Sequence, residues 1–157
     1  MNELLAIIKE QPFFEDMAPE HRRLLAACAA KCSYTPGTRL MRDHEPTETF
    51  WLIREGQVAL ESPLREGSVA FQTLGPGDIL GWSWLLPPYR ASYDARAVTD
   101  IHTLRFDAGV LRERMEANPA FGYVLMKHFA ALIVQRLQAA RLQALDIYSH
   151  GGPGHGN

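Results

Sequence analysis

Short runs of strand-forming residues fill the middle of this chain, from about residue 33 to residue 106, and they restrict its fold more than any other feature. Each run is bounded by Gly, Pro, Asp or Glu-Gly, and many alternate in character with a period of two, which is typical of strands with one buried face. The runs are TRLMR, TFWLIREG, QVALES, SVAFQTL, ARAVT and IHTLRF. Short strands at such regular spacing predict a sandwich or a closed barrel rather than a parallel sheet.

Two helices are predicted before these strands. Residues 2–10 have the apolar spacing of a short amphipathic helix, and Pro19 is typical of the first position of a second helix that runs to about Lys31. Cys28 and Cys32 would then lie one helical turn apart. Because no second pair of metal ligands accompanies them in the sequence, we interpret them as packed thiols.

A short helix capped by Asp107 and a long helix that begins at Asn118-Pro119 are predicted after the strands. The long helix is expected to end near Ile147, which gives it about 29 residues against a mean of about 11–12. Apolar or small residues follow heptad spacing along it, at Met126, Ala130, Ile133, Leu137, Ala140 and Ala144. This seam predicts a homodimer; the alternative is a helix that lies only on its own barrel. Residues 148–157 are rich in Gly and His and are predicted to be a disordered tail after a domain of residues 1–147.

The composition is that of a single globular domain. The 157 residues are 46% hydrophobic and 22% charged, and the net charge of −2 gives no overall attraction to nucleic acid. No signal-peptide pattern and no apolar run long enough to span a bilayer is present, so a cytoplasmic location without membrane association is expected.

The order of these elements, together with the segment GDILGWSWLLPPYRAS (residues 77–92), resembles the cyclic-nucleotide-binding domain family, the sensor module of catabolite-activator (Crp/Fnr-type) regulators. The resemblance covers residues 3–146 and rests on six segments in the family's order: FFEDMAPEHRRLLAACA, PGTRLMR, TFWLIREGQVAL, LGPGDILG, the segment around Arg90, and DAGVLRERMEANP with the long helix. It implies a mainly β fold, a jelly-roll-like double-stranded β-helix with N-terminal helices and a long C-terminal dimerisation helix.

The resemblance also implies an anion site. Arg90 would bind a phosphate, with the backbone N–H of Ala91 and the hydroxyl of Ser92 beside it, Gly81 at the entry turn and Ser83 at a helix start. Guanidinium and backbone N–H groups suit such an anion. The alternative for Arg90 is an ion pair with a surface carboxylate such as Asp94.

The pocket departs from the family at Trp82, where family members that bind cyclic nucleotides carry a glutamate for the ribose hydroxyl. An indole accepts no hydrogen bond, so cyclic AMP and cyclic GMP are expected to bind weakly or not at all. The possible ligands are therefore a cyclic nucleotide or another phosphate-bearing small molecule. Arg141 lies on the long helix in the region expected near a purine and could face an anion or a partner chain. Trp84 is expected in the core, while Trp82 and Tyr89 could plug the pocket or stack on a ligand.

The resemblance favours a stand-alone ligand sensor that acts through an unidentified protein partner, and the alternative is a dimeric structural module with a degenerate pocket. Direct DNA binding is not expected, because only about ten residues follow the long helix, too few for a helix-turn-helix. A haem or metal sensor is not favoured, because the histidines have no paired spacing: His21, His44, His102, His128, His150 and His155. No motif suggests catalytic residues or an enzyme.

Overall fold

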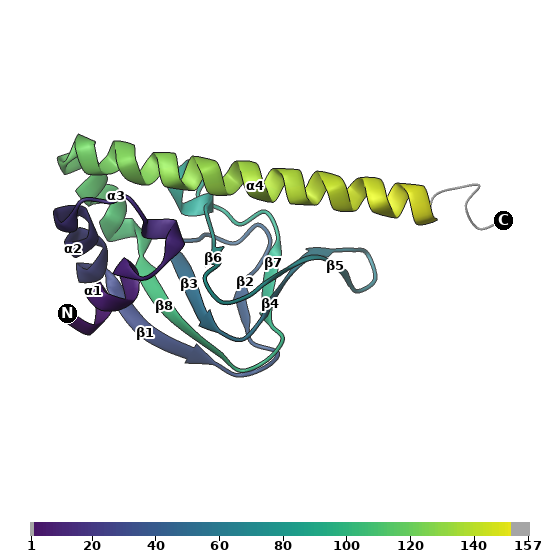
Figure 1. Cartoon of the computed structure of the whole chain (residues 1–157). Helices are drawn as coiled ribbons and strands as arrows, with labels where there is room; N and C mark the ends of the chain where they lie inside the picture. Colours follow the sequence, from purple (N-terminus) through teal and green to yellow (C-terminus); the bar gives the residue numbers. More distant parts are fainter. Residues whose placement is uncertain (1, 152–157) are drawn as a thin grey trace.

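The computed structural model describes the backbone of residues 2–151 and the side chains of residues 2–142, 144 and 145. Eight strands form the body of the domain and helices cover one end and one side (Figure 1). The elements are α1 (Asn2–Lys9), the 3-10 helix η1 (Pro12–Phe14), α2 (Pro19–Ala27), β1 (Ala29–Tyr34), β2 (Arg39–Met41), β3 (Thr49–Glu55), β4 (Val58–Pro63), β5 (Ser68–Leu74), β6 (Ile79–Leu80), the 3-10 helix η2 (Ser83–Leu85), β7 (Asp94–Ala97), β8 (Ile101–Asp107), α3 (Ala108–Ala117) and α4 (Pro119–Gly151).

The strands form two antiparallel four-stranded sheets, in the orders β1-β8-β3-β6 and β2-β7-β4-β5. Alternating side chains of β3 face opposite sides of the first sheet. Trp51 and Ile53 pack between the two sheets, whereas Phe50 and Leu52 pack beneath the helices. The predicted mainly β fold, a jelly-roll-like barrel with flanking helices, is confirmed.

The boundary between α2 and the first strand differs from the prediction. The helix ends at Ala27, and Cys32 lies on β1 rather than on a helix that continues to Lys31. The segment AAKCSY looks helical locally, but it pairs residue by residue with β8, from Ala29 opposite Phe106 to Tyr34 opposite Ile101. Pairing along the whole of β8 satisfies backbone groups that a longer helix would leave open at the sheet edge.

The two C-terminal helices begin where the sequence predicts. Asp107 Oδ1 accepts a hydrogen bond from the Val110 backbone N–H at 3.1 Å, and Asn118 Oδ1 accepts one from Phe121 N–H at 3.2 Å. Both are N-caps that satisfy a free helical N–H. The long helix ends at Gly151 rather than near Ile147, since nothing in the sequence before the Gly-Gly-Pro segment interrupts it. The remainder of the predicted tail, residues 152–157, lies outside the described residues.

Helix α4 crosses the barrel and then extends past it, beside the projecting β4–β5 hairpin (Figure 1). One face of α4 is buried against the barrel and the helices η1, α2 and α3, at Phe121, Leu125, Phe129, Leu132 and Arg136. In the part of the chain that the structure describes, no helix is long and apolar enough to cross a membrane.

Candidate functional site

The site lies where β6 turns into η2 beneath α4. Gly81 has a φ of +101°, and a Cβ atom there would meet the backbone oxygen of Thr49 at 3.2 Å. Only glycine adopts this conformation without strain, so Gly81 sets the sharp entry that the sequence predicted. Trp82 follows as the N-cap residue of η2 and is half-buried, with Ser83 beginning the short helix. Trp84 is completely buried under the helices, as predicted.

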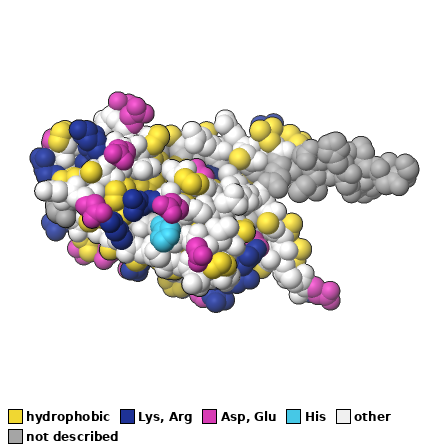
Figure 2. Space-filling view, turned by 60° about the horizontal axis from the view of Figure 1, so that its bottom comes forward, with side chains coloured by type: hydrophobic (Ala, Val, Ile, Leu, Met, Phe, Trp, Pro, Cys, Tyr) yellow, Lys and Arg dark blue, Asp and Glu magenta, His cyan; other side chains and the backbone are white. Residues whose placement is uncertain are grey.

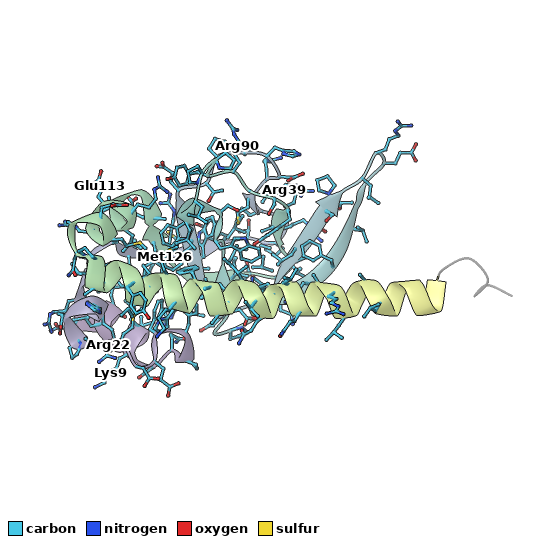
Figure 3. All side chains as sticks on the ribbon, turned by 90° about the horizontal axis from the view of Figure 1, so that it is seen from above. Lys9, Arg22, Arg39, Arg90, Glu113 and Met126 are labelled. Carbon is cyan, nitrogen blue, oxygen red and sulfur yellow. The ribbon has the colours of Figure 1, made fainter. Side chains whose placement is uncertain are left out.

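Arg90 points away from the barrel interior (Figure 3). Its side chain is exposed, and Nη1 donates a hydrogen bond of 2.9 Å to the backbone oxygen of His44. Ser92 is exposed as well, and the backbone N–H of Ala91 donates to the Glu45 oxygen at 2.9 Å. The residues expected to hold a phosphate therefore lie together in sequence, but their donors face the loop of residues 43–48 or solvent. Asp94, the other partner considered for Arg90, pairs with Arg39 at 3.0 Å.

Aromatic side chains fill the space between the sheets behind Trp82. The rings of Trp82 and Tyr93 have centroids 5.4 Å apart, and those of Tyr93 and Phe71 are 5.8 Å apart. The guanidinium of Arg136, from α4, lies 5.8 Å from the centre of the Trp82 ring. The mouth of the barrel is thus occupied by side chains of β5, α4, the turn after β6 and the residue just before β7.

Arg136 is a buried cation, with 7% of its surface exposed. Its Nη2 donates a hydrogen bond to the backbone oxygen of Ile79, while Nη1 is buried without a hydrogen-bond partner. Burial lowers the pKa of Arg136 from its ordinary value, with smaller opposing effects of Tyr93 and Asp78. Arginine nevertheless stays charged in proteins, so a positive charge is enclosed here.

The hydroxyl of Tyr93 is also buried without a partner. Burial raises the pKa of Tyr93 far above its usual range, so this phenol keeps its proton and remains a donor at neutral pH. An unpartnered buried polar group costs about 1–3 kcal/mol, and more when the group is charged. Arg136 Nη1 and the Tyr93 O–H are therefore two buried donors without a partner among the described residues, and both side chains lie near the Trp82 ring.

Arg141, the residue that the sequence placed on the helix near a purine, is exposed on α4. The buried arginine of this helix is Arg136, which sequence reasoning missed. The spacing of residues along α4 nevertheless indicates that Arg136 is buried, because it lies one helical turn after Leu132 on the same face as Phe129. A charged residue on a buried helix face is unusual enough to mark a candidate site.

Two antiparallel four-stranded sheets, a glycine turn followed by a short helix at the mouth, and a long C-terminal helix define the class of this β-barrel domain. A model of the cyclic nucleotide-binding domain matches residues 31–118, more than half of the chain. The chain belongs to the cyclic nucleotide-binding domain family.

Relatives with several architectures share this domain. Cyclic nucleotide-gated ion channel 18 of Arabidopsis thaliana is 25% identical over 93% of this chain and 20% of the channel. The HTH-type transcriptional regulator Cmr of Mycobacterium tuberculosis is 24% identical over 83% of this chain and 53% of the regulator. The structure of the Thermus thermophilus catabolite activator protein is similar with a TM-score of 0.66 and 26% identity, over 88% of this chain and 63% of that protein. The chain thus spans only 20% to 53% of the length of these two curated relatives.

Proposed function

We propose that this domain is a regulatory module that binds a small anionic ligand beneath α4 and signals through a partner protein. The observation that carries the proposal is the pair of free buried donors, Arg136 Nη1 and Tyr93 O–H. A phosphate or carboxylate group would accept from both and would neutralise the enclosed charge. Because these groups are packed in the present conformation, the ligand would enter as Trp82 and the turn of residues 81–85 move aside.

This site differs from the one proposed from sequence, which was centred on Arg90. For Arg90 to bind the same anion, its hydrogen bond to His44 would have to break and the side chain would have to turn inward. Arg136 requires no such reversal, since it already lies against Trp82. Trp82 provides no acceptor for a ribose hydroxyl, so the preferred ligand is a phosphate- or carboxylate-bearing molecule other than cyclic AMP or cyclic GMP.

The long helix provides a physical route from the ligand to a partner. Arg136 is part of α4, so an anion that draws its guanidinium away from the Ile79 oxygen would change how the helix is held on the barrel. The outer face of α4 exposes large apolar side chains, Tyr123, Met126, Val134, Leu137, Leu142 and Leu145. We propose that this face pairs two copies of the chain, with α4 coupling ligand binding to the dimer.

A second candidate function is a dimeric interaction module whose pocket is permanently filled. The packing of Trp82, Tyr93 and Phe71 favours it, since three rings already occupy the mouth of the barrel. The two candidates differ in the role of Arg136. In a filled module, Arg136 only holds α4 on the barrel through its hydrogen bond to the Ile79 oxygen. In a sensor, it also provides the positive charge that binds the ligand.

Catalysis and direct DNA binding are not part of the proposal. Among the side chains that the structure describes, no group of three or more His, Cys, Asp or Glu residues could hold a metal ion. Basic and acidic side chains are interspersed on the face of the domain drawn in Figure 2. A mixed surface of this kind lacks the basic stripe by which proteins attract a phosphate backbone.

We expect Arg136→Gln to weaken binding of a phosphate ester by at least about tenfold, because a charge-assisted hydrogen bond contributes about 1.5–3 kcal/mol. The measurement is calorimetric titration of the full chain with 5′-AMP and with cyclic AMP. Arg141→Gln is the matched control, since Arg141 is an exposed arginine on the same helix. Equal 5′-AMP affinity in wild type and Arg136→Gln contradicts the role of Arg136, and micromolar cyclic AMP binding by wild type contradicts the argument from Trp82.

Stability separates the sensor from the filled module. A ligand that binds only the folded state raises the free energy of unfolding. The sensor therefore predicts that 5′-AMP stabilises wild type but not Arg136→Met, whereas the filled module predicts no effect of 5′-AMP on either. A clear loss of stability in Arg136→Met, with no 5′-AMP binding by wild type, would instead support the filled module.

We expect Leu137→Asp to convert the dimer to a monomer without unfolding the domain. Leu137 is 67% exposed in the single chain, so an aspartate there disturbs only a partner helix. Light scattering at tens of micromolar gives the mass, and circular dichroism verifies the fold. Val98→Asp, an exposed apolar position in the turn between β7 and β8, is the control and should remain dimeric. A monomeric wild type, or a dimer unchanged by Leu137→Asp, would refute the proposed interface.

A further inference from the structure

A cavity of about 290 Å³ opens between β2 and the β3–β8 side of the barrel. We call it the arginine cavity and define it by the lining residues Arg39, Met41, Arg42, Thr47, Trp51 and Arg105. Trp82, Tyr93 and Arg136 are absent from its lining, so it is separate from the site beneath α4. Small-molecule sites in proteins usually have volumes of about 300–1,000 Å³, which places this cavity at the size of a small metabolite.

The arginines of the cavity differ in how their charges are balanced. Arg39 pairs with Asp94 at 3.0 Å and lies 3.6 Å from Glu61. Arg42 has only a long contact of 3.9 Å with Glu45, and an exposed pair of that kind contributes little. Arg105 has no ion pair among the described residues.

Two glutamates, Glu45 and Glu48, line the cavity together with the three arginines. Glu48 pairs with Arg112 at 3.0 Å, and Arg112 is not part of the lining. The lining therefore carries more positive than negative charges. The three guanidinium groups come from two strands and the loop after β2, and they can approach a bound oxyanion from different sides, as arginine sites for phosphate and carboxylate groups do.

Polar and apolar groups beneath the arginines complete the cavity. Thr47 is 7% exposed, and its hydroxyl is buried without a hydrogen-bond partner. Trp51 and Met41 give an apolar floor, and Trp51 Nε1 is held in place by a 3.0 Å hydrogen bond to the Tyr34 hydroxyl. The cavity therefore combines an arginine without an ion pair among the described residues (Arg105), an unsatisfied hydroxyl (Thr47) and an aromatic surface (Trp51). This combination fits a small molecule with an oxyanion at one end.

The cavity shares a wall with the Arg90 segment. Ala91 lines it, and the backbone of residues 43–48 is bonded to this segment from the other side, with Thr47 N–H donating to the Tyr89 oxygen at 2.8 Å. The carbonyl of His44, in the same loop, holds Arg90 outward. Figure 3 shows Arg39 and Arg90 on the same side of the domain.

We propose that the arginine cavity is a second ligand site, for a small phosphate- or carboxylate-bearing metabolite, with Arg105 as its main anchor. A ligand held there contacts the loop of residues 43–48, and so it controls whether Arg90 stays bonded to His44. The inference is independent of the site beneath α4, because it rests on different residues and a different opening of the barrel.

The test is calorimetric titration of the full chain with inorganic phosphate and, separately, with 5′-AMP. Arg105→Gln is expected to weaken phosphate binding by at least about tenfold, which corresponds to about 1.4 kcal/mol. Arg65→Gln, which changes an exposed arginine in the β4–β5 turn, should leave it unchanged. If Arg105→Gln does not fold, Arg105→Lys preserves the charge but loses the planar fork, and it should still weaken binding.

Two outcomes overturn the proposal: no saturable binding of either probe to wild type, or equal phosphate affinity in wild type and the Arg105 variants. Loss of phosphate binding in Arg136→Gln alone would also contradict it and would assign that binding to the site beneath α4. The two probes distinguish the ligand source. If 5′-AMP binds more tightly than phosphate in an Arg105-dependent manner, the Trp51 floor contacts the organic part, whereas equal affinities identify a site for the free anion.

Discussion

Gly56→Ala is expected to lower the free energy of unfolding by about 3–5 kcal/mol, the sum of a left-handed backbone penalty and severe overpacking. Gly56 joins β3 to β4 with a φ of +91°. A Cβ atom there would lie 2.2 Å from the Asp100 backbone oxygen and 2.6 Å from the Ile101 Cγ2 atom. Neither neighbour can move aside easily, because both belong to the turn and strand of β7–β8, and Ile101 is fully buried.

A matched glycine separates the two contributions. Gly37 has nearly the same φ, +88°, but an added Cβ atom would meet nothing within 4 Å. Gly37→Ala should therefore cost only the backbone penalty of about 1–2 kcal/mol. Urea unfolding followed by tryptophan fluorescence, at one fixed protein concentration because of the expected dimer, gives both values. Equal losses in the two variants would show that the contact with Asp100 is not the cause.

The barrel could be predicted from sequence because its signals are local. Alternation within each run and the turn residues between runs are fixed by neighbours only a few positions apart. The first strand was missed because LLAACAAKC has a local helical pattern, and only its pairing with β8, some seventy residues later, makes residues 29–34 a strand. The two-residue strand β6 is too short for any period to reveal it.

The site was only partly predictable, since side-chain direction depends on non-local contacts. The resemblance located Gly81 and Trp82 at the mouth of the barrel, because a turn glycine and the residue after it fix the backbone there. The direction of Arg90 depends on the carbonyl of His44, which belongs to a loop 46 residues earlier. No pattern within residues 77–92 contains that information.

Arg136 could have been found from the sequence with one further step. The heptad seam that includes Ile133 and Leu137 lies on the outer face of α4, and this face is the one that predicts a dimer. The same helix has a second, inner face, and an arginine one turn after Leu132 falls on it. Charged residues on inner faces are rare because burial of the charge is costly, so this position is informative without any alignment.

Trp84→Ala is expected to lower the free energy of unfolding by about 3–5 kcal/mol, the usual cost of removing a large buried aromatic side chain. Trp84 is fully buried, stacks on Phe50 with centroids 5.4 Å apart, and meets Phe129 edge-on at 5.1 Å. These contacts join the turn after β6 to both β3 and α4. The same variant should therefore also weaken ligand binding beneath α4, because the turn that positions Trp82 loses its anchor.

Trp84→Phe provides the control, since the indole Nε1 of Trp84 is buried without a hydrogen-bond partner. Phenylalanine keeps an aromatic ring against Phe50 and Phe129 but removes that polar group, whose burial costs about 1–3 kcal/mol. The smaller ring leaves a small cavity, and the two effects oppose each other, so the net change should stay within about 1 kcal/mol. Urea unfolding of both variants measures the difference. If Trp84→Phe were as unstable as Trp84→Ala, the indole N–H would have to be satisfied in solution, and the packing of η2 against α4 would require a different explanation.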